Sequence, residues 1–312
     1  MRLATVGKGG SGKTTLASLL AALLAARQQT VCAIDADINQ TLGSVLGIDE
    51  GILRALPGLG AAPAFLKNYL RGSRDLAHVV KTTLPGPDSA LLSLDPAHPV
   101  MRHYAHQHQG ILLMQAGGFD DQDIGTHCYH SKTGMVELWL NHLLDGADEF
   151  VIVDMTAGAD AFASGLFTRF DLTLLVVEPT RQSVSVYQQY KQYAAAYDLN
   201  IRVVGNKVAD ARDEEFIRAH CGADVIGCLR PCALVKARDR GEEAPLSLLE
   251  PHNRAVLEDI IHILCAQRRD WARYWEQAIE FHLKNAESWA NAYTGTDLSR
   301  QIQREYLKKL AA

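Results

Sequence analysis

The residues most able to do chemistry lie near the start of the chain, where Gly7–Thr15 reads GKGGSGKTT. This stretch fits the phosphate-binding pattern G-x-x-x-x-G-K-[ST], in which glycines let successive backbone N–H groups point at one anion. Lys13 would reach the β- and γ-phosphates of a nucleotide, and the Thr14 hydroxyl would be placed for Mg²⁺. An apolar run precedes the stretch, and a Leu/Ala-rich segment without Gly or Pro follows it over Thr15–Arg27. A strand, a loop and a helix N-terminus are therefore expected, which is the setting of a phosphate site. The predicted nucleotide contacts in this loop are Gly7, Lys8, Gly9, Gly10, Ser11, Gly12, Lys13, Thr14 and Thr15.

Two acids follow the second apolar run, Thr30–Ile34. Asp35 could help to hold Mg²⁺ through water, and Asp37 could orient or deprotonate the water that attacks the nucleotide. A helix cap or an Asx turn is the structural alternative, since Asp and Asn also favour those positions. The segment lies one crossover from the phosphate loop, at the same edge of the expected sheet, and this position favours a function in hydrolysis.

A further apolar run, Val151–Val153, ends in Asp154, which has the Walker B form and would support the water shell of Mg²⁺. Met155–Gly158 follows it. The Gly158 N–H would sense the γ-phosphate, because a residue without a side chain can approach closely. Loss of that phosphate would release the segment, so that hydrolysis would cause a conformational change.

The segment Val204–Val208 resembles the N-K-x-[DV] base-recognition segment of nucleotide-binding proteins. The Asn206 amide offers both a donor and an acceptor to a purine edge, and Lys207 would lay its alkyl stem along the base. The segment lacks the Asp that reads guanine, so ATP is favoured over GTP.

Lys8 and Lys13 together give K-G-G-x-G-K-T-T, which resembles the deviant P-loop of the family that includes MinD and ParA ATPases, nitrogenase iron protein, arsenical-pump ATPase and metallochaperone ATPases. In that family the extra lysine crosses to the nucleotide of the other subunit. The resemblance implies a homodimer formed on ATP binding, with Lys8 neutralising phosphate charge in trans. A solvated lysine in a glycine loop is the alternative. The resemblance also implies that Leu229–Pro231 closes the adenine pocket with Pro231, although Arg230 stands where the family usually has Ile or Leu.

The segment Gly125–His130, Gly-Thr-His-Cys-Tyr-His, resembles the nickel-insertion ATPases for carbon monoxide dehydrogenase, whose pattern at this place is G-x-C-x-C. The resemblance covers most of residues 1–265, including Leu138–Leu143, Val153–Gly158, Val177–Pro179 and Val204–Val208. Here His130 replaces the second cysteine. Cys128 and His130 from each of two subunits would give an S₂N₂ set that suits Zn²⁺ and is compatible with Ni²⁺ at the dimer interface. A cysteine that packs and histidines that hydrogen-bond within a loop are the alternative.

Composition excludes several classes of function. The 312 residues are 47% hydrophobic and 21% charged, as in ordinary globular proteins. A net charge of −5 argues against non-specific nucleic-acid binding as the main task. No stretch has the length of a membrane span and no signal peptide is evident. Six scattered cysteines are too few for a disulfide framework, so we expect a reducing cytoplasm.

Apolar, β-branched runs recur with helical segments between them, the pattern of a parallel sheet built from βαβ units. We predict an α/β fold with a doubly wound, mostly parallel sheet of the P-loop NTPase type and a C-terminal helical extension. Ligands of such sheets bind beyond the carboxyl ends of the strands. The expected strands are Leu3–Val6, Thr30–Ile34, Ile111–Gln115, Phe150–Asp154, Leu172–Glu178, Ile201–Asn206 and, more weakly, Asp224–Gly227.

We expect residues 1–265 to form the ATPase domain, with a helical and irregular insertion at 47–110, and residues 266–312 to form the extension. Aromatic residues from Trp271 to His282 follow helical spacing, Gly295 breaks the pattern, and Leu298–Leu310 predicts a second amphipathic helix. Packing on the rest of the chain is the favoured interpretation. A partner-docking surface is the alternative, and acidic residues in the tail disfavour a membrane-targeting helix.

These patterns together predict a cytoplasmic ATPase that uses ATP and Mg²⁺, dimerises on ATP and hydrolyses it slowly until a partner acts. A metallochaperone or maturation role for an unknown client protein is the leading hypothesis, with no specific nucleic acid or membrane as partner. A MinD/ParA-like ATPase that positions a protein partner without a metal site is the main alternative. A P-loop kinase or ligase acting on a small molecule is the third, although it would not need Lys8.

Overall fold

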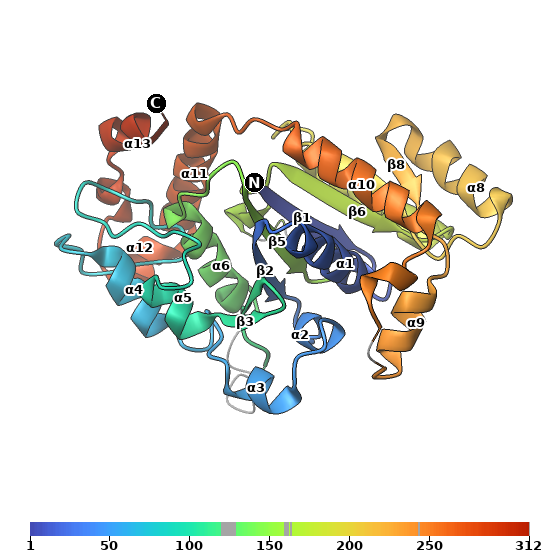
Figure 1. Cartoon of the computed structure of the whole chain (residues 1–312). Helices are drawn as coiled ribbons and strands as arrows, with labels where there is room; N and C mark the ends of the chain where they lie inside the picture. Colours follow the sequence, from blue (N-terminus) through green and yellow to red (C-terminus); the bar gives the residue numbers. More distant parts are fainter. Residues whose placement is uncertain (120–128, 159–161, 163, 243, 312) are drawn as a thin grey trace.

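The computed structural model describes residues 1–119, 129–158, 162, 164–242 and 244–311. In this part of the chain one eight-stranded sheet has the order β3-β4-β2-β5-β1-β6-β7-β8 (Figure 1). The strands are β1 (Arg2–Gly7), β2 (Thr30–Ala36), β3 (His106–His108), β4 (Ile111–Gln115), β5 (Glu149–Met155), β6 (Leu172–Val177), β7 (Ile201–Gly205) and β8 (Val225–Cys228). All neighbours pair in parallel except β3 and β4. The predicted mostly parallel sheet is confirmed.

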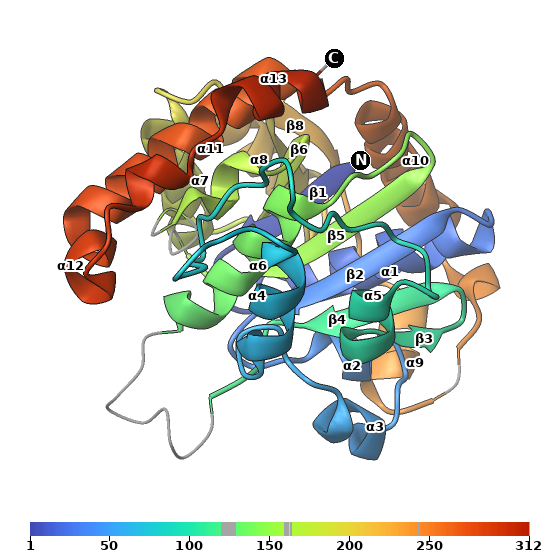
Figure 2. The same cartoon turned by 90° about the vertical axis from the view of Figure 1, so that its left-hand side faces the viewer.

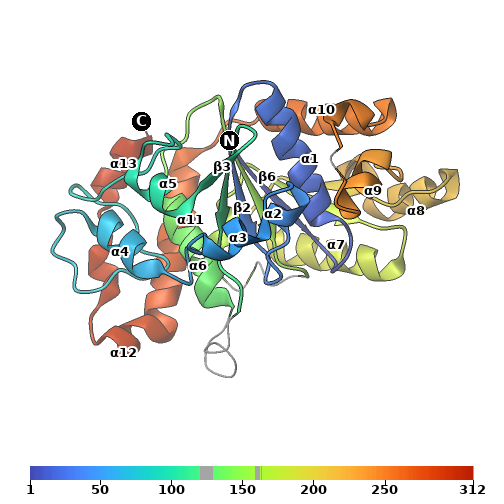
Figure 3. The same cartoon turned by 60° about the horizontal axis from the view of Figure 1, so that its bottom comes forward.

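Helices cover both faces of the sheet, because the central strands carry apolar side chains on both sides. The helices are α1 (Lys13–Ala26), α2 (Leu42–Val45), α3 (Glu50–Ala55), α4 (Pro63–Arg71), α5 (Pro99–Tyr104), α6 (His130–His142), α7 (Arg181–Ala194), α8 (Ala211–Cys221), α9 (Ala233–Asp239), α10 (Pro251–Cys265), α11 (Trp271–Asn285), α12 (Asn291–Thr294) and α13 (Arg304–Ala311). Buried residues of α1 and α10 pack on one face, and those of α6 and α7 pack on the other. Figure 3 shows the sheet between these two helical layers, as expected for a doubly wound fold. None of the helices in the described ranges has both the length and the apolar character needed to cross a membrane.

The strand at one edge of the sheet, β3, was not predicted. It lies within the segment 47–110, which we expected to be helical and irregular, and it pairs antiparallel with β4. Gln109 and Gly110, both with positive φ, form the turn between the two strands. The prediction is wrong for His106–His108, because a three-residue His-Gln-His strand has neither the length nor the β-branched side chains that signal a strand.

The C-terminal segment also differs in part from its prediction. Helix α11 runs on through a π-helical turn into α12, which ends at Gly295 with a φ of 67° (Figure 2). The single helix predicted over Leu298–Leu310 is wrong, since a 3₁₀ turn at Leu298–Gln301 and α13 are separated by extended backbone at Ile302. The Gln301 side chain turns inward there and donates a hydrogen bond to the His78 carbonyl oxygen at 2.8 Å.

Buried ion pairs fasten the C-terminal segment to the sheet. Arg2, the first residue of β1, pairs with Asp145 at 2.7 Å, and Arg269 pairs with both Asp145 and Asp171 at 2.7 Å. Arg2 also donates a hydrogen bond to the Tyr274 hydroxyl of α11 at 2.8 Å. Burial alone would raise the pKa of Asp145, but the guanidinium groups of Arg2 and Arg269 outweigh it and hold that pKa well below its ordinary value. The expectation that this segment packs on the rest of the chain is confirmed, whereas the division into two domains at residue 265 stays a prediction.

Candidate nucleotide-binding site

The glycine loop joins β1 to α1, as the sequence predicts, and two of its glycines cannot be replaced without a clash. A Cβ on Gly7, whose φ is 144°, would lie 2.6 Å from the carbonyl oxygen of Val176 in β6. A Cβ on Gly12, whose φ is 98°, would lie 2.1 Å from the Nδ2 atom of Asn206. The loop therefore lies against the neighbouring strand and against the predicted base-recognition segment, and this close approach requires glycine.

Helix α1 begins with the two side chains expected to face the phosphates. The Lys13 side chain is buried, with 5% of its residue surface exposed, and its Nζ donates to the Lys8 carbonyl oxygen at 3.4 Å. The Thr14 hydroxyl donates to Oδ2 of Asp154 at 2.5 Å. The N-cap residue Gly12 supplies no side-chain hydrogen bond to the first turn of α1. The helix N-terminus thus offers backbone N–H groups and a positive dipole end to an anion.

Two acids that the sequence placed at strand ends meet across neighbouring strands. Asp35 and Asp154 are register partners in β2 and β5, and both are fully buried. Burial raises the pKa of Asp154 to about 6, against the hydrogen bond from Thr14. Burial and the nearby Asp154 carboxylate raise the pKa of Asp35 well above its ordinary value. These carboxylates and the Thr14 hydroxyl are all hard oxygen donors, the kind that Mg²⁺ prefers, and a divalent cation would offset their repulsion.

Asp35 and Asp37 also form the kind of turn that we gave above as the structural alternative to a function in hydrolysis. The Asp35 oxygens accept hydrogen bonds from the N–H groups of Leu42 and Asp37, at 2.7 and 3.2 Å. Oδ1 of Asp37 accepts from the backbone and the side chain of Asn39, at 2.9 and 3.0 Å. A carboxylate has further lone pairs, so these bonds leave room for a second role. The metal and water roles of the two acids stay predictions.

Gly158 connects the segment after β5 to the phosphate loop. Its N–H donates to the carbonyl oxygen of Gly7 at 3.0 Å, and its φ is 78°. The predicted γ-phosphate contact of Gly158 would require this N–H to change partner. Residues 159–161 and 163, which follow Gly158 in the sequence, lie outside the described residues.

The predicted base-recognition segment contacts the glycine loop directly. The Asn206 amide donates to the Ser11 carbonyl oxygen at 2.7 Å, and Nζ of Lys207 donates to the Gly10 carbonyl oxygen at 2.6 Å. Lys207 has a φ of 58°, in the left-handed region. Residues far apart in the sequence are thus brought to one end of the sheet, as expected for a nucleotide site.

The predicted adenine wall lies beside that segment. The N–H of Val208 donates to the Leu229 carbonyl oxygen at 3.2 Å. The Asn253 side chain of α10 binds both the N–H and the carbonyl oxygen of Arg230, at 2.9 and 3.1 Å. Pro231 follows and is exposed. Arg230, which differs from the usual Ile or Leu of the family, is therefore held in place through its backbone groups. The role of Pro231 at the base stays a prediction.

Glu178 contacts two residues of the candidate site but was not predicted from the sequence as a site residue. It directly follows β6, and its carboxylate lies 3.4 Å from Nζ of Lys8 and 2.6 Å from Nζ of Lys207. Burial raises the pKa of Glu178, but the hydrogen bonds and charges of the two lysines outweigh it, so the pKa lies below its ordinary value. The signal was present, since Glu178 ends an apolar run in the same way as Asp35 and Asp154 do.

The predicted interfacial metal ligands are described only in part. Cys128 lies outside the described residues, and His130 begins α6. The described ranges hold no group of three or more His, Cys, Asp or Glu side chains placed to bind one metal ion. Two other histidines have structural partners: His98 caps α5 by accepting a hydrogen bond from the N–H of Val100, and buried His142 bonds to the Leu138 carbonyl oxygen.

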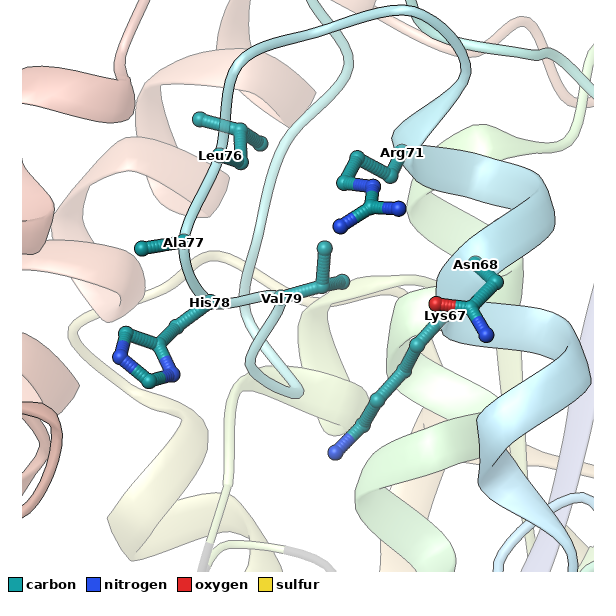
Figure 4. A pocket seen from close by; sticks show the side chains of 7 residues that line it. All are labelled: Lys67, Asn68, Arg71, Leu76, Ala77, His78 and Val79. Carbon is teal, nitrogen blue, oxygen red and sulfur yellow. The ribbon is translucent and has the colours of Figure 1, made fainter.

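A hollow of about 250 Å³ lies away from these residues, between α4 and the segment that follows it (Figure 4). It is lined by Lys67, Asn68, Arg71, Leu76, Ala77, His78 and Val79. None of these residues belongs to the glycine loop, the acid pair or the base-recognition segment. The hollow is therefore distinct from the candidate nucleotide site.

The doubly wound sheet, the glycine loop ahead of α1 and the buried acids at the strand ends define a P-loop nucleotide-binding protein. The chain belongs to the CobQ/CobB/MinD/ParA nucleotide binding domain family, whose model matches residues 3–244. The resemblance to MinD- and ParA-like ATPases inferred from the glycine loop is thus confirmed.

Two relatives illustrate the similarity in sequence. Carbon monoxide dehydrogenase accessory protein CooC of Rhodospirillum rubrum is 28% identical over 245 residues, which cover 77% of this chain and 87% of that protein. An uncharacterised ATP-binding protein of Methanocaldococcus jannaschii is 28% identical over 232 residues, covering 73% of this chain and 84% of its own length.

Solved structures show the shared fold. The MinC:MinD cell division protein complex of Aquifex aeolicus has a chain that matches with a TM-score of 0.55 and 19% identity, covering 86% of this chain and 97% of that chain. A ParA family ATPase from Chlorobium tepidum matches with a TM-score of 0.57 and 13% identity, covering 84% of this chain and 98% of that chain. At these identities the likeness is one of architecture alone.

Proposed function

We propose that this protein is a cytoplasmic ATPase that dimerises when it binds ATP and hydrolyses it slowly until a client protein acts. The observation that carries the proposal is the different setting of two lysines in one glycine loop. Lys13 is buried at the start of α1, whereas the Lys8 side chain is 35% exposed on the loop. Lys13 suits the phosphates of its own nucleotide, and Lys8 can reach the nucleotide of a second subunit.

The other site residues have separate tasks in this proposal. Lys13 and the backbone N–H groups of the loop bind the phosphates. Thr14, Asp35 and Asp154 would hold Mg²⁺, which neutralises phosphate charge when bound. Asp37 orients the attacking water, and the Gly158 N–H exchanges its bond to the Gly7 carbonyl for one to the γ-phosphate. The base lies between Asn206, Lys207 and Pro231, a set that favours ATP over GTP.

The Lys8→Ala variant tests the cross-subunit role. The change keeps the Lys8 carbonyl that Lys13 contacts, so ATP affinity should stay within about threefold of the wild type. ATP-dependent dimerisation and turnover should each fall at least about tenfold, because phosphate charge is no longer neutralised in trans. Light scattering during an ATP titration and a phosphate-release assay measure both.

Lys191→Ala is the matched control, since Lys191 is an exposed lysine of α7 that pairs with Asp224. It should behave as the wild type. Unchanged dimerisation and turnover in Lys8→Ala would remove the cross-subunit role, and with it this proposed function.

We further propose that the ATPase serves the maturation of a metal-dependent client and carries Zn²⁺ or Ni²⁺ between its two subunits, bound by Cys128 and His130. The support is the sequence pattern of Gly125–His130, the similarity to an accessory protein of carbon monoxide dehydrogenase, and the position of His130 at the start of α6. A second candidate is a partner-positioning ATPase without a metal site. The histidine in place of the second cysteine favours it.

Metal content separates these two candidates. We expect about one metal ion per ATP-bound dimer in the wild type and loss of that metal in Cys128→Ser, because two subunits are needed to complete four ligands. Elemental analysis and molar mass, each with and without ATP, provide the measurement. Cys265→Ser is the matched control, since Cys265 is a partly exposed cysteine at the end of α10. A metal-free dimer that forms equally well in all three proteins would favour the partner-positioning ATPase.

A further inference from the structure

One carboxylate contacts two lysines that have different tasks in the proposed function, Lys8 at the phosphates of a second subunit and Lys207 at the base of its own nucleotide. Oε2 of Glu178 lies 3.4 Å from Nζ of Lys8, and Oε1 lies 2.6 Å from Nζ of Lys207. The Glu178 side chain is 11% exposed, whereas both lysines are more open to solvent. We call these three residues the lysine clamp. It joins the phosphate loop to the base-recognition segment within one chain.

The fold fixes the place of Glu178 independently of its charge. Strand β6 lies beside β1, with Val176 opposite Gly7 in the register, so the end of β6 lies next to the start of the glycine loop. The N–H of Glu178 donates to Oγ of Ser183 at 3.0 Å, in the first turn of α7. These backbone contacts do not use the carboxylate. A neutral side chain of the same shape can therefore replace Glu178 without moving the strand end.

The lysine clamp opposes the cross-subunit contact of Lys8. An ammonium group paired with Glu178 in its own chain is not available to a phosphate of the second subunit. We propose that Glu178 is a positioning residue that restrains Lys8 within its own chain and thereby sets the ATP concentration at which the dimer forms. The inference rests on the proposed function, since it assumes that Lys8 acts in trans.

The geometry makes this restraint a weak one, as a reversible switch requires. Lys207 takes the shorter of the two contacts, and its Nζ also donates to the Gly10 carbonyl oxygen at 2.6 Å. Lys8 has the longer contact, at the outer limit of hydrogen bonding. Ion pairs that are open to solvent on one side contribute little, so a second subunit can compete for Lys8. Removal of the carboxylate should shift the monomer–dimer equilibrium toward the dimer.

Glu178→Gln tests the inference. The ATP concentration at half-maximal dimerisation should fall by up to about fivefold, the range expected for one partly exposed ion pair. Light scattering in an ATP titration gives that midpoint, and binding of a fluorescent ATP analogue at low protein concentration gives the monomer affinity. Glu214→Gln, which removes an exposed pair with Arg218 on α8, is the matched control and should leave the midpoint unchanged.

A double-mutant cycle separates restraint of Lys8 from a general electrostatic effect. Loss of a negative charge near the phosphates could strengthen ATP binding whether or not Lys8 is present. The inference requires that Glu178→Gln shift the midpoint in the wild-type background and have no effect in Lys8→Ala. An equal shift in both backgrounds, or none in the wild type, overturns it. If Lys8→Ala itself dimerises as the wild type does, the proposed function has failed instead.

Glu178→Asp keeps the test valid if the glutamine variant does not fold. It retains the charge but withdraws the carboxylate by one methylene group from a lysine that is already 3.4 Å away. The midpoint should fall in the same direction, again only when Lys8 is present. Thermal unfolding of each variant shows which of them to use. A midpoint that stays at the wild-type value in a folded Glu178→Asp variant contradicts the inference.

Discussion

Replacing Lys13 with alanine is expected to weaken ATP binding by about 10- to 150-fold and to abolish turnover. A hydrogen bond to a charged group contributes about 1.5–3 kcal/mol, which corresponds to that range of affinity. Lys13 begins α1, is 5% exposed and contacts the carbonyl oxygen of Lys8. Its ammonium is therefore held in the loop, with little freedom to lose when phosphate binds.

Calorimetric titration with ATP and a phosphate-release assay check this expectation. Lys308→Ala, which removes an exposed lysine of α13 paired with Glu305, serves as the control and should bind ATP normally. The thermal stability of Lys13→Ala must be measured alongside, so that loss of binding is not confused with unfolding. Turnover that persists in a folded Lys13→Ala protein would remove the phosphate-loop assignment.

The strands of the sheet other than β3 could be predicted because each contains a short apolar run. The predicted Phe150–Asp154 is one residue shorter than β5 at each end, and the predicted Ile201–Asn206 is one residue longer than β7 at its C-terminal end. The 3₁₀ turn before α13 could not be predicted, because the spacing from Leu298 to Leu310 fits a helix. Gln301, at the end of that turn, donates a hydrogen bond to the backbone of His78, a contact distant in sequence that spacing cannot reveal.

The sequence was enough to place the acids of the candidate site at one edge of the sheet. It was not enough to predict that Asp35 and Asp154 lie beside each other. Asp35 and Asp154 face each other because of the register of β2 against β5, and spacing along the chain does not give register. A similar limit applies to the contacts of Glu178. Its meeting with Lys8 and Lys207 depends on the strand order β1-β6-β7, which brings together three residues far apart in the sequence.

Replacing Asp37 with alanine should have the other large effect: ATP hydrolysis should become much slower, and ATP binding should not change. Positioned proton acceptors contribute about 10²- to 10⁴-fold to rates, so turnover should fall by that range. ATP binding should be kept, because the residues proposed to hold the phosphates are untouched. The variant loses the two bonds from Asn39 to Oδ1 of Asp37, but the N–H of residue 37 can still donate to Oδ1 of Asp35. The ATP-bound dimer should therefore accumulate.

The time course of molar mass after ATP addition, together with phosphate release, measures this trapping. Asp297→Ala, which removes the cap of the 3₁₀ turn near the C-terminus, should turn over normally and is the control. Asp37→Asn is informative in a second way, because the amide keeps the shape of the side chain but cannot take a proton. If it restores turnover, Asp37 orients the water by hydrogen bonding; if it is as slow as alanine, the negative charge is required.

Asp37→Ala and Lys8→Ala should have opposite effects on the dimer. Loss of Lys8 should prevent the dimer from forming, whereas loss of Asp37 should prevent it from dissociating, although both variants hydrolyse ATP slowly. Slow turnover alone therefore does not identify either role, but slow turnover together with the molar mass does. Normal turnover in Asp37→Ala would mean that the water-orienting acid lies elsewhere, and a monomeric Asp37→Ala protein in ATP would mean that this residue acts in dimerisation.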